Sequence, residues 1–470
     1  MGFRMDILAT DVLLYILFLS IAGFAFYASR HEHLRTPWRQ VRRRPMAMAA
    51  LVLLLAYVTV GALDSVHFQL VDKQLSAEKS EAVYHPDSLS LLDLVIEPLR
   101  VQKEKTYSSP FAVYGFTKET VEQEPGKRAR SFSRLTWGGR HLEDPATVSD
   151  DIASRTLKVL VLAFMTVVAV AALVSWRIQM TSELSFQNAL RLLARGEADT
   201  PWRAILSSLF VLLFVVFFIA ELGPLYHIFG TDQVGNDVLY KSLKSIRTGL
   251  MIGTLTTLIM LPFAVMLGIT AGYFRGWADD VIQYLYTTLS SIPGVLLIAA
   301  AILSLDVYMA NNPEGFNTLA SRADTRLLFL CMILGIMSWT GLCRLVRAET
   351  MKLREADYVQ AAQALGVRAG RIMTRHIFPN LMHIVLITIV LDFSGLVLAE
   401  AVLSYVGVGV DPSMDSWGNM INGARLEMAR EPMVWWSLTA AFIFMFGLVL
   451  AANIFSDAVR DAFDPRLRKR

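Results

Sequence analysis

The chain has 470 residues, of which 54% are hydrophobic and only 18% are charged. Soluble domains usually carry about 25% charged residues, and the apolar residues here gather in runs near the ~20 residues that cross a bilayer. The composition therefore excludes an ordinary soluble domain and predicts a membrane protein. The net charge of +3 is too small to indicate a partner.

Nine apolar segments are predicted to span the membrane as helices. They are residues 12–28, 47–63, 158–175, 203–222, 249–270, 283–304, 327–345, 383–405 and 434–456. Ser290, Ser291 and Pro293 interrupt the sixth, and such a break is tolerated where neighbouring protein satisfies the freed backbone. The first segment follows Arg4 like a signal peptide, but its length and the missing small-residue cleavage site favour a retained helix.

Three basic stretches predict the orientation of these helices. Residues 30–44 hold six arginines, residues 344–380 hold seven arginines and lysines, and residues 466–470 close the chain with four more. Nine crossings place all three on one side, which is the cytoplasm by the positive-inside rule. We therefore expect an N-terminus outside the membrane and a C-terminus in the cytoplasm.

A polar, mildly acidic stretch over 64–157 is predicted on the outer side. Its apolar segments 89–96 and 111–115 favour a small core of their own, and a loosely ordered loop is the alternative. A contact surface for an external partner and an insertion without direct chemistry both stay open. The expected division of the chain is 1–63, 64–157, 158–202 and 203–470.

Motifs for catalysis and metal binding are missing from the sequence. It has no G-x-x-x-x-G-K-[ST] phosphate loop and no H-E-x-x-H pair. Cys331 and Cys343 lie twelve residues apart in one predicted helix, or about 18 Å at ~1.5 Å per residue, which is too far for a disulfide. We expect no enzymatic activity, no bound cofactor and no metal in this chain.

The connection between the seventh and eighth spans carries the clearest functional pattern. An amphipathic helix is predicted over 349–364, with Ala361 and Ala362 keeping its outer surface shallow. Gly366 permits the left-handed geometry that stops a helix, a second helix follows over 368–376, and Pro379 ends the unit. A shallow helix of this kind can enter a groove on a partner, and a plain helical hairpin is the alternative.

The order Tyr358-Val359-Gln360-Ala361-Ala362, then Gly366, His376 and Pro379, resembles the EAA loop of ABC-importer permeases, in particular the dipeptide/oligopeptide permease family. Six further motifs are similar to that family and follow its order over about 203–470. They lie at 229–237, 271–274, 291–293, 399–404, 416–420 and 460–466. Two residues depart from the pattern, since Gln360 replaces a glutamate and Asn236 replaces an arginine.

The resemblance implies an all-α polytopic protein with a type I ABC-importer permease core, about nine transmembrane helices and an external insertion. It implies half of a peptide pathway in a bacterial cytoplasmic membrane, completed by a second homologous permease subunit. One or two ABC ATPase subunits would bind ATP and Mg and hydrolyse the nucleotide. An extracytoplasmic peptide-binding protein would deliver the cargo.

The resemblance also implies roles for single residues. The ATPase-coupling loop would contain Tyr358, Gln360, Ala361, Ala362, Gly366, His376 and Pro379. The translocation path would contain Glu400 and Pro293, which lie in these motifs. Asp392 joins them because a charge within an apolar segment usually faces a cavity or a partner. The outer gate would contain Asp232, Asp237 and Trp417.

Alternatives remain open at several of these positions. Asp392 is equally a path residue or a buried carboxylate bonded to a neighbouring helix. Glu400 is more often structural at such a place, and Trp417 is ordinarily an aromatic anchor at the membrane interface. Other cargoes (nickel or glutathione), a proton-driven transporter using Asp392 and Glu400, and a sensing scaffold are the rival functions.

Overall fold

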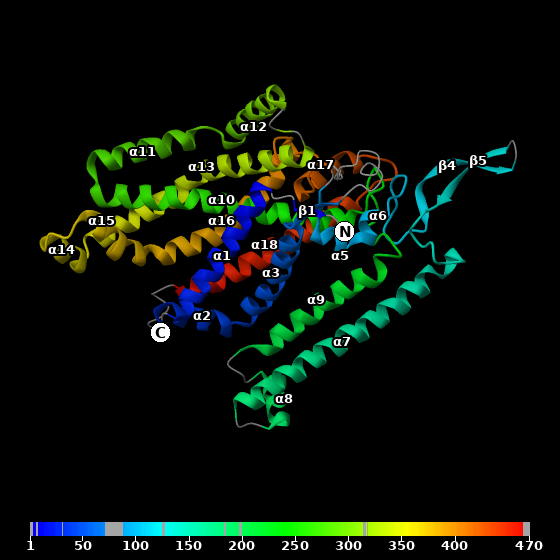
Figure 1. The fold of residues 1–470 in the computed structure, drawn as a ribbon, viewed down its shortest axis with the longest axis horizontal. Helices are drawn as coiled ribbons and strands as arrows, with labels where there is room; N and C mark the ends of the chain where they lie inside the picture. The colour runs from blue at the N-terminus through cyan, green and yellow to red at the C-terminus, as the bar shows by residue number, and fades with distance from the viewer. Residues whose placement is uncertain are drawn as a thin grey trace.

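The structure, a computed structural model, describes residues 3–5, 8–30, 32–70, 88–124, 127–182, 185–196, 200–313, 316 and 318–463. Figure 1 shows a bundle of long helices running between two ends of the molecule. The short helices α14 (Asp357–Ala364) and α15 (Ala369–Ile372) lie at one end, called the α14 end. The strands β4 (Tyr114–Glu124) and β5 (Lys127–Arg134) project at the other, called the β4–β5 end.

Eight helices in the described part of the chain are long and apolar enough to cross a membrane. Seven of the nine predicted segments correspond to single helices of this set. The sixth overlaps only in part with the helix that begins at Gly294, and the first falls in α1 (Ala9–Arg30), whose apolar part is Ala9–Ser20. The eight helices, with η1 (Pro145–Thr147) joined to α7, are α3 (Pro45–Asp64), α7 (Val148–Thr181), α9 (Trp202–Leu222), α10 (Val238–Phe274), α12 (Gly294–Asn311), α13 (Leu319–Arg354), α16 (Phe378–Val406) and α18 (Trp436–Phe463).

The sixth predicted span is broken, as its serines and proline indicate. Helix α11 (Gly276–Ser291) ends before Ile292, and α12 begins after Pro293, which is exposed. Helices α10 and α13 have 37 and 36 residues. At ~1.5 Å per residue each is about 55 Å long, so both extend well beyond a hydrocarbon core of about 30 Å.

Small residues let α10 and α13 approach closely in the centre of the bundle. A Cβ atom added at Gly272 would lie 2.6 Å from Thr350 Cβ, and one at Gly268 would lie 2.8 Å from Val346 Cβ. Close packing over glycine is the usual way for membrane helices to associate, because lipid offers no hydrophobic drive. The 271–274 motif therefore fixes the spacing of the two helices that lead toward α14.

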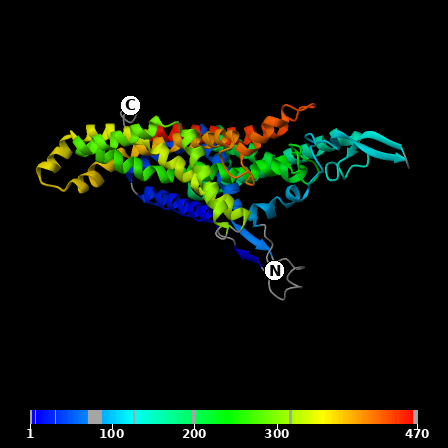
Figure 2. The ribbon, with the colours of Figure 1, turned by 90° about the horizontal axis from the view of Figure 1, so that it is seen from above.

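The N-terminal helices pack on this bundle. Figure 2 shows α1 along one side of the layer formed by the core helices. Helix α2 (Glu32–Arg43) places Trp38 and Val41 against α18, in a cluster with Val459 and Phe463. Helices α7 and α9 form a separate hairpin beside α3, joined at its tip by α8 (Phe186–Arg195).

The predicted insertion contains strands that the sequence did not indicate. β1 (Phe3–Met5), β2 (His67–Leu70) and β3 (Leu89–Ser90) form a small antiparallel sheet, and β4 and β5 form a hairpin. The helices α5 (Leu91–Val95) and α6 (Glu97–Val101) follow β3. Residues 71–87 lie outside the described residues.

A separate core for the insertion is a wrong prediction. Leu99 and Phe111 instead pack against Leu222, Tyr226 and Leu239, at the ends of α9 and α10. The insertion therefore uses the spanning helices as its core, since its few apolar side chains are too scattered to bury one another.

Candidate functional site

The chain between α13 and α16 forms a compact element at the α14 end. Helix α13 runs on to Arg354, so the predicted helix over 349–364 is wrong in its first part, and only α14 is a separate helix. After the turn at Gly366 (φ +74°), α15 and a π-helical turn, η3 (Met373–Ile377), lead directly into α16. Pro379 lies in the first turn of α16, where proline is favoured, so it begins a helix rather than ending one.

One face of α14 is packed against the rest of the protein. Val359 is fully buried and Ala362 is 8% exposed, both in a cluster with Ile372 and Ile377. The expectation that Ala362 lies on the outer surface is therefore wrong. Successive residues of a helix point about 100° apart, so of the two alanines only Ala361 is exposed.

An exposed face of α14 next to the buried one is apolar. Tyr358 is 45% exposed, Leu365 is 83% exposed, and the exposed Ala361 lies between them. Spacings of three and four residues place these side chains in one stripe along the helix. We call Tyr358, Ala361 and Leu365 the α14 stripe, and it offers a partner an apolar surface outside the spanning segments.

Hydrogen bonds hold the element in this shape. Asn380 Nδ2 donates to Tyr358 Oη at 3.2 Å and to the His376 carbonyl at 2.7 Å, which ties α14 to the start of α16. Gln363 Nε2 donates to Tyr273 Oη at 3.4 Å, at the end of α10. The element is therefore joined to α10 and α16 by side chains as well as by the backbone.

The departure at Gln360 has a local physical reason. Its amide nitrogen donates to the Glu355 carbonyl at 3.3 Å and to Glu355 Oε2 at 3.4 Å. Glu355 also pairs with Arg275 at 2.7 Å. A carboxylate at 360 could not donate these bonds and would face a like charge, so the amide suits this position.

A second arrangement of polar groups surrounds the turn before α10, at the β4–β5 end. Asp237 caps α10, accepting from Leu239 N at 2.8 Å, and its other oxygen lies 2.7 Å from His227 Nδ1. Asp232 accepts from the backbone N–H groups of Val234 and Asn236, both at 2.9 Å. Asp232 and Asp237 thus organise this turn, and their role in an outer gate stays a prediction.

The insertion closes over this turn. Glu104 lies 3.5 Å from His227 Nε2 and accepts from Trp137 N at 2.7 Å. Burial acts to raise the pKa of Glu104, but His227 and the backbone N–H groups around it lower that pKa to about 2. Burial acts to lower the pKa of His227, but its interactions with Asp237 and Glu104 raise that pKa to about 9. His227 thus lies between the carboxylates of Asp237 and Glu104, which favour its protonated form.

Buried charges also join α1 to the core. Arg247 of α10 is 6% exposed and pairs with Asp11 at 2.6 Å, and His67 Nδ1 lies 2.9 Å from the same carboxylate. Beside them, Thr10 donates through its hydroxyl to Asp324 of α13. Because an isolated charge is costly at membrane depth, this network fixes the start of α1 against α10 and α13.

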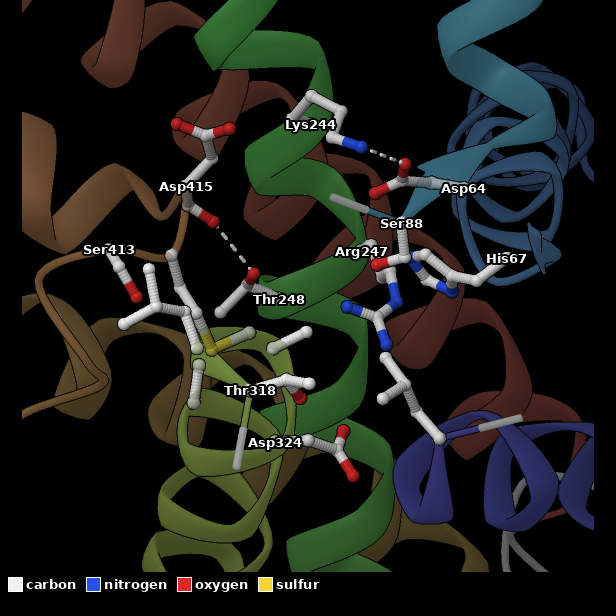
Figure 3. Close-up of a pocket in the computed structure, with 15 residues that line it drawn as sticks. Asp64, His67, Ser88, Lys244, Arg247, Thr248, Thr318, Asp324, Ser413 and Asp415 are labelled. Atoms are coloured by element: carbon white, nitrogen blue, oxygen red, sulfur yellow. Dashed lines mark hydrogen bonds and ion pairs between the residues drawn. The ribbon is translucent and has the colours of Figure 1, made fainter. Parts of the chain in front are cut away.

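A cavity of about 490 Å³ opens beside these charges. Figure 3 shows its wall, with Lys244 paired to Asp64 and Thr248 donating to the backbone carbonyl of Asp415. Side chains in the described part of the chain form no group of three His, Cys, Asp or Glu arranged for a metal. The lining combines apolar side chains, such as Leu8 and Met414, with charged side chains of both signs.

Comparison with known proteins places the chain in a family. Residues 264–469 match the family described as binding-protein-dependent transport system inner membrane component. The chain is 31% identical over 244 residues to the glutathione transport system permease protein GsiD of Pectobacterium atrosepticum, covering 52% of this chain and 73% of that protein. The chain belongs to this permease family.

A second relative agrees with this assignment. The oligopeptide transport system permease protein OppC of Mycobacterium bovis is 31% identical over 242 residues, which cover 52% of this permease and 77% of that protein. A chain of the MetNI methionine ABC transporter aligns with a TM-score of 0.34 and 16% identity, covering 47% of this chain and 93% of that chain. The family match and the eight long apolar helices in the described residues make the permease a multi-pass membrane protein with a helical core.

Two residues predicted in the path and gate are buried inside the permease. Glu400 is 2% exposed and accepts from Ser404 Oγ at 2.7 Å, and a Cβ at Gly418 would lie 2.6 Å from Glu400 Oε1. Trp417, at the start of α17 (Trp417–Glu427), is 1% exposed and donates to the Ser242 carbonyl at 3.1 Å. The reading of Trp417 as a membrane-interface anchor is therefore wrong, because the residue is buried in a cluster with Leu250, Val397 and Ala441. Its role in an outer gate stays a prediction.

The remaining path residues are more accessible. Asp392 is half-buried in the middle of α16, and Pro293 is exposed at the break before α12. Asp392, Pro293 and Glu400 do not line the cavity of about 490 Å³. Their role in the path stays a prediction.

The sequence reasoning missed the networks around Arg247 and His227. A signal existed for the first, because Asp11, Arg247 and Asp324 border apolar segments where a charge needs a partner. Little in the sequence indicated the network around His227, because Glu104 and His227 are 123 residues apart in the chain.

Proposed function

We propose that this permease forms half of the pathway of an ATP-driven importer of di- and oligopeptides in a bacterial cytoplasmic membrane. Its 31% identity to an oligopeptide permease, over 77% of that protein, supports the class of cargo. The α14 stripe is the observation that carries the coupling, because an apolar surface outside the membrane needs a protein to cover it.

The partner at the α14 stripe would be an ABC ATPase subunit, one or two per importer. ATP and Mg bind in that partner, and this chain binds no cofactor and carries no hydrolytic activity. Closure of the ATPase pair moves α14, and the packing of Val359 and Ala362 on Ile372 and Ile377 passes the movement to α16. Transport is then an equilibrium between two conformations that a distant ligand shifts.

The other partners follow from the same proposal. A second homologous permease subunit completes the pathway, and an extracytoplasmic peptide-binding protein delivers the cargo at the β4–β5 end. The α14 end faces the cytoplasm together with the C-terminus, and the N-terminus lies outside. The arginine-rich α2 lies toward the α14 end in Figure 1, which supports this orientation by the positive-inside rule.

Glutathione import is the second candidate, since a glutathione permease is equally similar at 31% identity. Competition separates the two cargoes. Uptake of a labelled dipeptide that unlabelled di- and oligopeptides suppress, and glutathione does not, supports the peptide importer. Suppression by glutathione alone contradicts it.

Leu365→Asp tests the coupling surface. Leu365 is 83% exposed, so a charge there leaves the fold intact while opposing an apolar contact. We expect the ATPase subunit to be lost on co-purification from membranes and uptake to fall at least about tenfold, which corresponds to ~1.4 kcal/mol.

Leu426→Asp is the matched control, because Leu426 is 69% exposed near the β4–β5 end. This variant should retain the ATPase subunit. Normal uptake and normal co-purification with Leu365→Asp would overturn the assignment of the α14 stripe.

A further inference from the structure

The short helix α2 carries a dense group of arginines, which the proposed function uses only to orient the chain. Arg35, Arg39, Arg42 and Arg43 are all exposed. Because successive residues of a helix point about 100° apart, these four side chains fall within roughly 100° of one another around the helix. They form one continuous basic side of the helix, which we call the α2 face.

The other side of α2 is fixed to the bundle. Pro37 and Val41 are buried. The Trp38 ring stacks on Phe455 at 6.5 Å between centroids and meets the edge of Phe463 at 5.7 Å, both in the last turns of α18. Because these contacts hold the helix against α18, the α2 face is turned away from α18.

The level of α2 in the membrane follows from its neighbours in the chain. Pro45 starts α3, a helix long enough to span, and the next residue, Met46, is 75% exposed. On the other side, Arg30 ends α1 with its guanidinium 4.2 Å from the centre of the exposed Phe26 ring. Figure 1 shows α2 joining the ends of α1 and α3. Exposed apolar side chains thus lie within about two helical turns of both ends of α2, which places this helix where hydrocarbon meets water.

The arginines at this boundary differ in whether the chain neutralises them. Arg44, the residue after α2, pairs with Asp461 of α18 at 2.6 Å. In the described part of the chain, the side chains of Arg35 and Arg42 form no ion pair or hydrogen bond. Both guanidinium groups are therefore open to anionic groups from outside this chain.

We propose that the α2 face binds the headgroups of anionic phospholipids in the leaflet where α3 begins, with Arg35 and Arg42 as contact residues. A guanidinium matches a phosphate group with two parallel hydrogen bonds. Each basic residue beside an anionic membrane surface strengthens binding by about fivefold. The proposal holds for any cargo, and the proposed orientation decides only that this leaflet is the cytoplasmic one.

Lipid fits the α2 face better than the acidic surface of a protein. The exposed side chains of Phe26 and Met46 on either side of α2 are apolar and belong in hydrocarbon. A polar headgroup at the same level lies directly above that hydrocarbon, so one lipid can satisfy both the arginines and the apolar side chains next to them.

Native mass spectrometry of the purified full-length permease tests the proposal. The protein is equilibrated in mixed micelles that hold equal amounts of phosphatidylglycerol, which is anionic, and phosphatidylcholine, which has no net charge. We expect the wild type to retain phosphatidylglycerol at least about tenfold over phosphatidylcholine. Arg35→Gln combined with Arg42→Gln should reduce this preference at least about fivefold.

Two matched double variants serve as controls. Arg35→Lys with Arg42→Lys keeps both charges and should hold the preference within about threefold of the wild type. Lys118→Gln with Arg130→Gln removes the same charge from exposed positions of the β4–β5 hairpin, which projects from the bundle in Figure 1, and should leave the preference unchanged. Thermal unfolding of each variant checks that its fold is retained.

Three results overturn the proposal: equal retention of both lipids by the wild type, an unchanged preference in the α2 glutamine variant, or an equal loss in the hairpin control. Loss of the ATPase subunit from the α2 glutamine variant, with its lipid preference intact, would assign the α2 face to a protein partner instead. The measurement needs neither ATPase nor peptide. Normal uptake by Leu365→Asp would therefore refute the coupling surface while leaving the lipid site standing, and the reverse also holds.

Discussion

Polar groups are arranged in opposite ways at the two ends of this permease. At the β4–β5 end, charged side chains such as Arg247 and His227 are buried and paired within the chain. At the α14 end, the Arg275–Glu355 pair is about half exposed and Leu365 is almost fully exposed.

The polar groups of the β4–β5 end find their partners within this chain, whereas the α14 end leaves exposed surface that a partner can cover. Burial makes the contacts of the β4–β5 end strong and costly to break, whereas water screens those at the α14 end. Changes at the first end should therefore alter stability, and changes at the second should alter coupling.

Removing a carboxylate at each end tests this contrast most strongly. Asp11→Ala leaves the buried Arg247 without its partner at 2.6 Å and should cost about 3–5 kcal/mol of unfolding free energy. Glu355→Ala removes the exposed pair with Arg275 and should cost less than about 1 kcal/mol. Unfolding in detergent, followed by circular dichroism, measures both, and equal costs would break the comparison.

A pH titration gives the next largest effect. The raised pKa of His227, about 9 against an ordinary 6.5, means that the folded state holds its proton more tightly than the unfolded state. This stabilisation, about 3 kcal/mol, is complete below pH 6.5 and is lost as the pH rises toward 9.

Glu104 acts at the other limit of pH. Its pKa of about 2, lowered from 4.5, stabilises the fold above pH 4.5, and this contribution disappears as the pH falls toward 2.

Unfolding measured between pH 6 and 9.5 checks the His227 effect, and His227→Gln should flatten the curve of unfolding free energy against pH. An unchanged slope in that variant would show that another group titrates.

Two glycines with similar backbone angles provide a finer comparison. Gly235 (φ +80°) faces the Glu104 carbonyl oxygen so closely that an added Cβ would collide with it, whereas Gly366 (φ +74°) has open space. Gly235→Ala should destabilise by about 2–4 kcal/mol from conformation and crowding together. Gly366→Ala should cost only about 1–2 kcal/mol, and a larger loss there would mean that the open side is occupied.

The smallest effect is expected at Gln360. Gln360→Glu removes the bond to Glu355 and sets two carboxylates side by side on an exposed surface. Like charges in such a place cost about 0.5 kcal/mol, so unfolding should change little and uptake should stay within about twofold. A large loss of uptake would show that the amide itself contacts the ATPase.

The spanning helices and the position of the coupling element could be predicted from the sequence, because apolar length and basic flanks are local properties. The break at Pro293 and the stop at Gly366 were also local, and both are confirmed. The predicted helix start at 349 and helix end at 376 were wrong, because α13 continues to Arg354 and the chain stays helical from α15 through η3 into α16.

The sequence by itself therefore determined that this chain is a multi-span permease, since hydrophobic periodicity and short motifs act over a few turns. Only the tertiary structure decided which alanine of α14 is exposed, how Asp11 meets Arg247, and that the insertion seals the turn before α10. The contacts of Asp11 with Arg247 and of Glu104 with His227 join residues more than a hundred positions apart, and the geometry of all three features depends on how whole helices pack.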